Sequence, residues 1–249
     1  MKTLIVRACS AALLWTSLVS VSAAQNQPAP EPEILPLTVF ENLKAGKKQT
    51  VVTYGTSLTH KGTWPKALAD YLEEHYPEQV TFVNSARSGM TSQWGVENFK
   101  ERVLAHKPDL VFIEFSINDA DVNKDVPLDK SKANLDQMVK SLKSRNPNVN
   151  IVLQTMNLAW DSPRNEKRFG SNRPEILAYY DIYRNYAREN KLTLIDNLLT
   201  WQKILNEEPE RYHKMVPDGI HPSSVNSLAI TWTAVKALLD KTRSAVESR

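Results

Sequence analysis

The chain of 249 residues contains 31 Lys and Arg against 28 Asp and Glu, a formal net charge of +3, and 41% of its residues are hydrophobic. This composition excludes a disordered, collagen-like or coiled-coil chain, and a charge so close to neutral provides no basic surface for nucleic acid. The length fits one α/β domain, since such domains commonly contain roughly 200–250 residues.

Residues 1–24 have the features of a secretion signal. Lys2 and Arg7 flank the start of an apolar and small-residue stretch over 8–24 that ends in two alanines, which suit signal peptidase. The stretch is short and interrupted by serines, which favours a cleaved signal over a retained membrane anchor. Its removal leaves 29 basic against 28 acidic residues, a net charge of +1. We therefore expect a periplasmic or extracellular protein whose mature chain has no stable membrane insertion and no nucleic-acid partner.

Cys9 is the single cysteine and lies inside that signal. The mature chain then lacks a thiol for a disulfide, a nucleophile or a Cys-ligated metal. HExxH, P-loop and GxGxxG patterns are also missing from the sequence, so we expect neither a metal nor a cofactor. Four of the 14 prolines fall between Pro28 and Pro36, which predicts an extended linker over 25–44 before a domain at 45–249.

The domain alternates short apolar runs with longer amphipathic ones. Five runs rich in β-branched and aromatic residues are typical of buried strands: 50–54, 81–83, 110–115, 151–154 and 192–195. Apolar residues at helical spacing predict helices near 64–75, 135–142, 176–187 and 224–244. This alternation predicts a three-layer α/β/α sandwich around a five-stranded parallel sheet, with ligands bound at the carboxyl ends of the strands.

Polar motifs occur where that sheet is expected to bind ligands. Gly55-Thr56-Ser57 follows the first strand, a segment containing Gly89 follows the second, and Ser116-Ile117-Asn118-Asp119 follows the third. Asp218 and His221 form a DxxH pair near the end of the chain. Each motif alone is weak, but four of them in this order are a strong joint signal.

The order and spacing of these motifs resemble the SGNH hydrolases, also called GDSL esterases and lipases. The resemblance extends over about residues 50–239 and implies a flavodoxin-like fold and a serine esterase. It implies that Ser57 is the nucleophile, His221 the general base and Asp218 the residue that orients it. Gly89 and Asn118 would form the oxyanion hole with the backbone amide of Ser57. Two motifs depart from the family: Gly-Thr-Ser stands for Gly-Asp-Ser, and Ser-Ile-Asn-Asp for Gly-x-Asn-Asp.

Physical chemistry independently supports a catalytic role for these residues. A serine hydroxyl needs a base within hydrogen-bond reach, and histidine supplies one near neutral pH. Asp218 precedes His221 by three residues, close enough in a turn to bond its ring and stabilise the imidazolium. A glycine amide and an asparagine side chain are neutral donors suited to a developing oxyanion.

Each residue also has a purely structural interpretation. Ser57 would cap a helix, Asn118 and Gly89 would stabilise turns, and the DxxH pair would cap the last helix. His213 is the best alternative base, although it has no carboxylate at the same spacing. We interpret Asp119 as a structural hydrogen-bonding partner.

The substrate is less defined by the sequence. Trp94 and Trp160 follow strands and are the candidates for stacking on a sugar, although the sequence favours a packing role for each of them. Trp160 opens a long polar segment that is a candidate loop beside the pocket, and no apolar lid is evident. We expect an esterase that removes short acyl groups, such as acetyl, from a polysaccharide or another polar carrier. The alternatives are an envelope lysophospholipase or thioesterase, an acyltransferase, and a non-catalytic glycan-binding protein.

Overall fold

The computed structural model describes residues 37–249, which are built around one parallel sheet. Its strands run in the order β2-β1-β3-β4-β5, and every neighbouring pair is parallel. The strands are β1 (Gln49–Gly55), β2 (Val80–Asn84), β3 (Leu110–Glu114), β4 (Asn150–Thr155) and β5 (Thr193–Asp196). The predicted five-stranded sheet is confirmed, and its order is the flavodoxin-like one.

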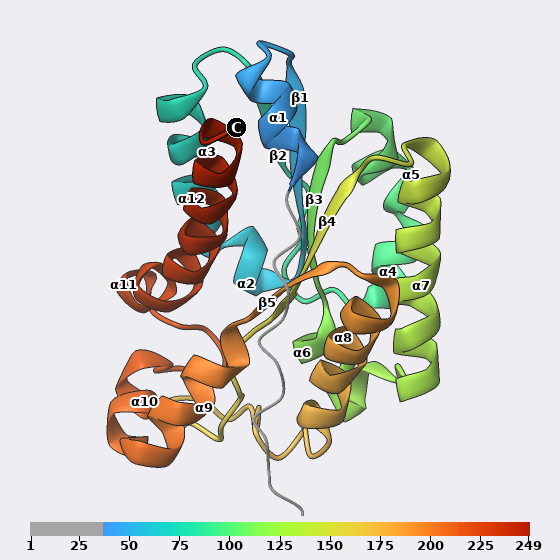
Figure 1. Cartoon of the computed structure of the whole chain (residues 1–249). Coiled ribbons are helices and arrows are strands. Elements are labelled where there is room, and N and C mark those ends of the chain that lie inside the picture. Colours follow the sequence, from blue (N-terminus) through green and yellow to red (C-terminus); the bar gives the residue numbers. More distant parts are fainter. Residues whose placement is uncertain (1–36) are drawn as a thin grey trace, which may run out of the picture. The chain divides into compact units, whose positions relative to one another are not determined.

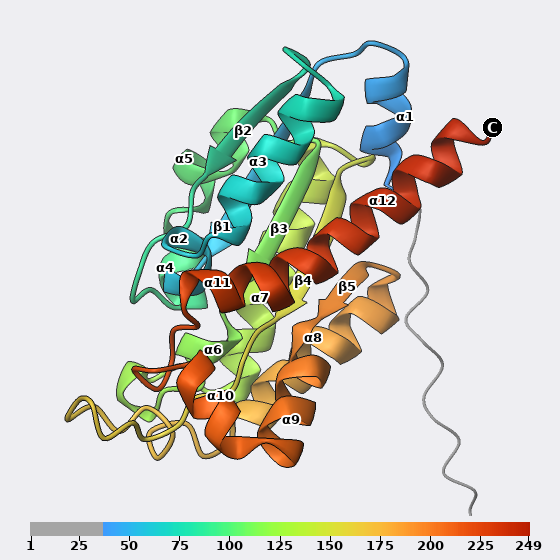
Figure 2. The ribbon, with the colours of Figure 1, turned by 90° about the vertical axis from the view of Figure 1, so that its left-hand side faces the viewer.

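Helices cover both faces of the sheet (Figure 1). One face carries α1 (Thr38–Lys44), α3 (Trp64–His75) and α12 (Thr233–Glu247), which lie side by side in Figure 2. The other face carries α4 (Ser92–Glu97), α5 (Phe99–Arg102), α7 (Leu128–Arg145) and α8 (Ile176–Asn190). Adjacent strand residues alternate between the two cores: Val51 packs in the first and Val52 in the second. The strands are therefore apolar on both sides, as parallel strands between helices require.

The predicted C-terminal helix is interrupted by a wider turn. It consists of α11 (Ser224–Ser227), a π-helical turn η3 (Leu228–Trp232) and α12. Two helices not foreseen from the sequence, α9 (Asn197–Glu207) and α10 (Pro209–Met215), form a small separate core with each other. The remaining elements are the single-turn α2 (Ser57–His60), η1 (Leu104–His106), α6 (Ser116–Asp119) and η2 (Val122–Lys124).

The predicted linker boundary at residue 44 needs correction. Residues 38–44 form α1, in which Phe40 and Leu43 are fully buried in the core that also holds α12. The prolines before this segment favour an extended chain. The burial of two large apolar side chains on one face of the segment favours a helix more strongly. The predicted signal at 1–24 and the rest of the linker lie outside the described residues. Within 37–249 no helix is both long and apolar enough to span a bilayer.

Candidate active site

Ser57 is the first residue of α2, directly after β1. The helix is capped by Thr56, whose hydroxyl accepts a hydrogen bond from the Leu58 amide at 3.2 Å. The structural alternative in which Ser57 itself is the cap is therefore wrong. Because the first amides of a helix have no partner inside it, the Ser57 N–H is available to a ligand.

A buried glutamate holds this turn in place through hydrogen bonds. Glu114 ends β3, is 1% exposed, and accepts hydrogen bonds from the Thr56 amide at 2.6 Å and the Thr59 hydroxyl at 2.7 Å. A Cβ at Gly55 would lie 2.3 Å from the Glu114 carboxylate, so only glycine fits there. Sequence reasoning missed Glu114, although a single carboxylate within the apolar run LVFIEF was a usable signal.

Burial also changes the acidity of this carboxyl group. Loss of solvent raises the pKa of Glu114 to about 7, against the lowering effect of the hydrogen bonds from Thr59 and Thr56. The carboxyl therefore titrates near neutral pH within the turn that carries Ser57.

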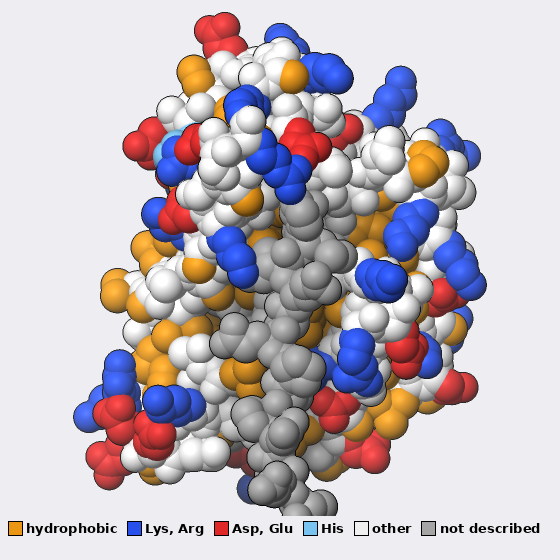
Figure 3. Space-filling view, in the orientation of Figure 1, with side chains coloured by type: hydrophobic (Ala, Val, Ile, Leu, Met, Phe, Trp, Pro, Cys, Tyr) orange, Lys and Arg blue, Asp and Glu red, His pale blue; other side chains and the backbone are white. Residues whose placement is uncertain are grey.

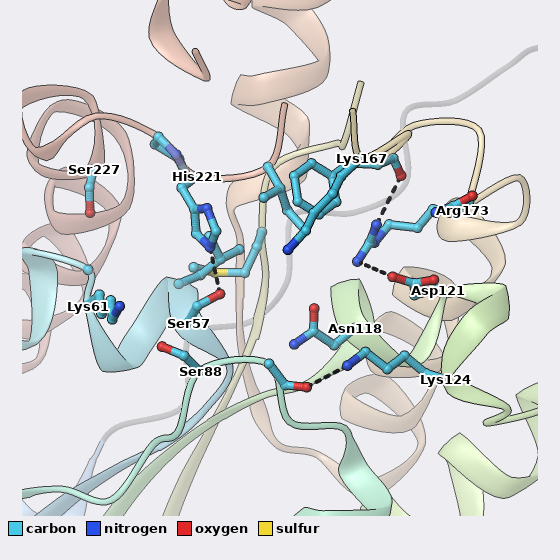
Figure 4. Close-up of a pocket in the computed structure, with 18 of the residues that line it drawn as sticks. Ser57, Lys61, Ser88, Asn118, Asp121, Lys124, Lys167, Arg173, His221 and Ser227 are labelled. Carbon is cyan, nitrogen blue, oxygen red and sulfur yellow. Dashed lines mark hydrogen bonds and ion pairs between the residues drawn. The ribbon is translucent and has the colours of Figure 1, made fainter. Parts of the chain in front are cut away.

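The DxxH pair lies beside Ser57 and forms a continuous chain of hydrogen bonds with it (Figure 4). His221 Nε2 lies 2.8 Å from Ser57 Oγ, and His221 Nδ1 lies 2.6 Å from Asp218 Oδ2. The second oxygen of Asp218 accepts the backbone amides of His221 at 2.7 Å and Ile220 at 3.0 Å. Partial burial raises the pKa of Asp218, but these hydrogen bonds outweigh it and hold the pKa below its usual value. A carboxylate anion thus faces the histidine at neutral pH.

Loops, rather than strands, hold the turn that carries Asp218 and His221. The Trp160 amide donates to the Gly219 carbonyl at 2.8 Å, and the Ser162 hydroxyl donates to the Pro217 carbonyl at 2.7 Å. Asn157, just after β4, donates from its side chain to the Ile220 carbonyl at 2.9 Å. The segment after β4 therefore fixes where the histidine lies.

Gly89 lies in the loop after β2 and Asn118 lies in α6, and both residues line the same cavity. Gly89 has φ of +78°, a left-handed conformation that favours glycine, while a Cβ there would meet no atom within 4 Å. The Asn118 side-chain nitrogen donates to the Met90 carbonyl at 2.9 Å, and its second N–H remains for a ligand. With the Ser57 amide, these groups can supply three donors to one oxyanion.

The other polar candidates are structural. Asp119 is 1% exposed and accepts hydrogen bonds from the Ser92 amide and the Ser131 hydroxyl, both at 2.7 Å, which agrees with the structural role predicted for it. His213 stacks on Trp160 with ring centroids 3.9 Å apart. It does not line the cavity that contains Ser57.

Trp94 and Trp160 are not brought to that cavity either. Trp94 packs against Tyr54, with ring centroids 5.7 Å apart, beneath the Arg102 guanidinium. Trp160 donates its Nε1–H to the Val216 carbonyl at 2.7 Å and packs on the small core of α9 and α10. Both rings therefore make packing contacts outside the cavity lining, which is the interpretation that the sequence favours.

The cavity over Ser57 has a volume of about 780 Å³. The polar segment predicted to border it does so, since residues 166–169, 172 and 173 line the wall opposite α2. In the described part of the chain, no cluster of three or more His, Cys, Asp and Glu residues could hold a metal ion.

Comparisons with known proteins agree with this geometry. The chain is 28% identical over 197 residues to an arylesterase of Vibrio mimicus, covering 76% of this chain and 88% of that one. Its fold is similar to an acetylxylan esterase from Geobacillus stearothermophilus, with a TM-score of 0.63, 22% identity and coverage of 78% and 94% of the two chains. It is also similar to an α/β hydrolase enzyme from the metagenome of Lake Arreo, with a TM-score of 0.61, 21% identity and coverage of 77% and 95%.

The family model of the GDSL-like lipases and acylhydrolases matches residues 52–225, which include the end of β1, all strand-end motifs and the DxxH turn. Because this match spans most of the chain, the protein belongs to the GDSL-like lipase/acylhydrolase family and is a carboxylic ester hydrolase.

Proposed function

We propose that the protein is an exported serine esterase that removes short acyl groups, acetyl above all, from a polar carrier such as a polysaccharide. The main evidence for the reaction type is the chain of hydrogen bonds from Ser57 through His221 to Asp218. Ser57 and His221 line the cavity. The arylesterase and acetylxylan esterase likenesses support the same reaction class. Export rests on the signal-like sequence of residues 1–24.

In the first half of the reaction, His221 Nε2 takes the proton of Ser57 as its hydroxyl oxygen attacks the ester carbonyl. The carbonyl oxygen becomes an anion that the Ser57 and Gly89 amides and the Asn118 side chain stabilise. His221 then gives the proton to the departing carrier oxygen, leaving an acyl-serine.

In the second half, His221 takes a proton from water as the water oxygen attacks the acyl-serine. His221 then gives this proton to Ser57 Oγ as the acyl–oxygen bond breaks, which releases the carboxylic acid and restores Ser57. Asp218 stabilises the imidazolium that forms in each half and keeps Nδ1 protonated in the neutral ring. A sugar hydroxyl in place of water would make the same site an acyltransferase.

The cavity lining favours a short acyl group on a large polar carrier. Only five of its 24 residues have apolar side chains other than glycine: Leu58, Met156, Phe169, Ile220 and Pro222. A volume of about 780 Å³ greatly exceeds an acetyl group and lies in the range of sites for much larger ligands. Most of the residues that line the cavity are therefore polar or charged.

One observation favours a longer acyl chain and keeps a lysophospholipase or thioesterase as the second candidate. Val225 and Leu228 are 74% and 37% exposed on α11 and η3, next to the cavity residues Ser224 and Ser227. Exposed apolar side chains on elements that line a cavity can contact an acyl tail that extends beyond it.

Hydrolysis of aryl acetate, butyrate and octanoate tests this function. We expect acetate to be the best substrate and Ser57→Ala to lose roughly 10⁴-fold or more of the rate. Ser88→Ala, which removes another hydroxyl of the same cavity, serves as the matched control and should retain most activity.

Each other result has a definite meaning. A rate that rises toward octanoate transfers the assignment to the lipid or thioester substrates. Equal rates for wild type and Ser57→Ala contradict the serine mechanism. If neither protein turns over any ester while both bind glycans equally, the protein is a glycan-binding module.

A further inference from the structure

The wall of the catalytic cavity carries an excess of positive charge. It contains five basic residues, Lys61, Lys124, Lys167, Arg168 and Arg173, but only two acidic ones, Asp121 and Glu166. The whole chain has a net charge of only +3. On the face drawn in Figure 3, outside its grey atoms, basic and acidic side chains are intermingled. The excess in the cavity is therefore a local feature.

Two of the five cations have carboxylate neighbours. The Arg173 guanidinium bonds Asp121 at 2.9 Å, and Arg168 lies 4.0 Å from Asp161. Among residues 37–249, no carboxylate lies within 4.0 Å of the ammonium groups of Lys61, Lys124 and Lys167. Three ammonium groups are thus available to an anion inside the cavity.

The segment that carries Lys167 is tied to the protein by a buried arginine. Arg173 is 3% exposed, and its Nε donates to the Ile117 carbonyl at 2.6 Å while Nη1 donates to the Phe169 carbonyl at 3.0 Å. Because Ile117 directly precedes Asn118, the arginine joins this wall to the helix that holds an oxyanion donor. Lys167 therefore extends from a fixed wall, although its own end is exposed.

The three lysines come from separate walls. Lys61 follows α2, and Lys124 ends η2 with its ammonium 2.9 Å from the Gly89 carbonyl. Figure 4 shows the Lys167 side chain reaching from its loop into the cavity. An ammonium group has three donors, so Lys124 keeps two after bonding Gly89.

We propose that these three lysines attract the carboxylates of an acidic carrier, so that the substrate is a short-chain ester of an acidic saccharide. This inference rests on the proposed esterase function. A short acyl group such as acetyl is uncharged, which leaves the carrier as the part of the substrate that meets the ammonium groups. Exposed lysines attract an anion weakly and in a salt-dependent way, so each should change selectivity by roughly two- to fivefold.

The test compares two substrates that differ only in charge: acetylated oligogalacturonides with free carboxylates, and the same oligosaccharides with methyl-esterified carboxylates. We expect wild-type kcat/KM to be about tenfold higher for the acidic form. Lys61→Gln and Lys167→Gln should each lower this ratio about twofold, and the double variant should lower it about fourfold, since Lys124 remains.

Lys241→Gln is the matched control, since it removes an exposed lysine of α12 far from the cavity lining. It should leave the ratio unchanged. Addition of 0.5 M NaCl should lower the ratio as the double variant does, since salt screens exposed charges over about 4 Å at that concentration.

A wild-type ratio of one or below, or a lysine variant that slows both esters equally, overturns the inference while leaving the esterase function intact. The saccharide assignment is overturned if the lysine variants hydrolyse acetyl-coenzyme A more slowly than wild type while wild type shows no preference between the two saccharides. If no ester is hydrolysed, calorimetry can measure the binding of both deacetylated oligosaccharides to Ser57→Ala. Tighter binding of the acidic form that depends on the lysines supports the inference. Equal binding of the two forms overturns it.

Discussion

The two halves of the hydrogen-bonded chain rest on different kinds of support. Ser57 follows a strand, and a carboxylate that is itself 1% exposed holds its turn from inside the sheet. Asp218 and His221 lie in a loop held by hydrogen bonds from the segment after β4, and their side chains are 43% and 41% exposed. The nucleophile is fixed by the core, whereas the base is fixed by loop contacts.

This difference separates two kinds of sensitivity. Changes near Asp218 and His221 can alter the reaction with little cost in stability, because the side chains are half in solvent. Changes near Ser57 act on buried groups and should affect folding and its pH dependence. Substitutions in each half therefore give distinguishable results.

The largest effect on kcat is expected for Asp218, which lies in the part of the site that loops hold in place. Asp218→Asn keeps the shape of the side chain but removes the charge that stabilises the imidazolium, so kcat should fall by roughly 10³–10⁴-fold. The melting temperature should change little, because the carboxylate is half exposed. Steady-state kinetics and thermal unfolding measure the two quantities.

Asp161→Asn provides the control for that substitution, since Asp161 is a carboxylate of the neighbouring loop that bonds Ser171. It should leave kcat within a fewfold. A comparable loss in both variants would mean that Asp218 acts only by holding the loop.

The next largest effect on kcat is expected for Asn118, which lies in the part of the site that follows the strands of the sheet. Asn118→Ala removes one oxyanion donor and should lower kcat by roughly 10²–10³-fold, about 3–4 kcal/mol in barrier, with KM nearly unchanged. Asn172→Ala removes an asparagine side chain from the same cavity and should retain activity, since Asn172 bonds Val122 through its backbone carbonyl. A loss confined to KM would place Asn118 in substrate binding instead.

The sequence predicted the sheet well because each strand is a continuous apolar run bounded by polar residues. It also placed Ser57, Gly89 and Asn118 at one edge, since the carboxyl ends of parallel strands must meet. It did not predict α9 and α10, whose small core depends on contacts between Trp201 and Tyr212. Pairings between separate helices leave no spacing signal in the chain.

Glu114 shows a second limit of sequence reasoning. Its position in a strand was evident, but its function depends on Gly55 and Thr56 in the neighbouring strand and turn, which only the register brings together. Trp94 and Trp160 show the same limit, because a position after a strand does not determine which way a ring points.

A smaller effect is expected from the titration of Glu114. Its pKa in the folded protein is raised from 4.5 to about 7, so the folded state binds the proton more tightly than the unfolded one. The stabilisation is fully present below pH 4.5 and is lost as pH rises through about 7, on the order of 3 kcal/mol. Glu114→Gln, a neutral side chain of the same shape, should remove this dependence.

Chemical denaturation of both proteins from pH 4 to pH 9 measures it. The difference in unfolding free energy should shift in favour of the glutamine variant between about pH 4.5 and 7, and stay level above that window. Asp218 has the opposite sign, since its lowered pKa gives a stabilisation that is lost as pH falls through the folded-state value. A difference that is constant with pH would mean that folding does not shift the pKa of Glu114.

The smallest effect tests whether Trp160 is a packing residue. Trp160→Phe keeps an aromatic ring against His213 but removes the hydrogen bond to the Val216 carbonyl, which should lower the free energy of unfolding by about 1 kcal/mol. kcat/KM should stay within twofold for aryl acetate and for saccharide esters, because the ring does not line the cavity. A rise in KM for saccharide esters alone, without loss of stability, would instead show that this ring contacts the sugar and that the loop half of the site extends beyond the cavity.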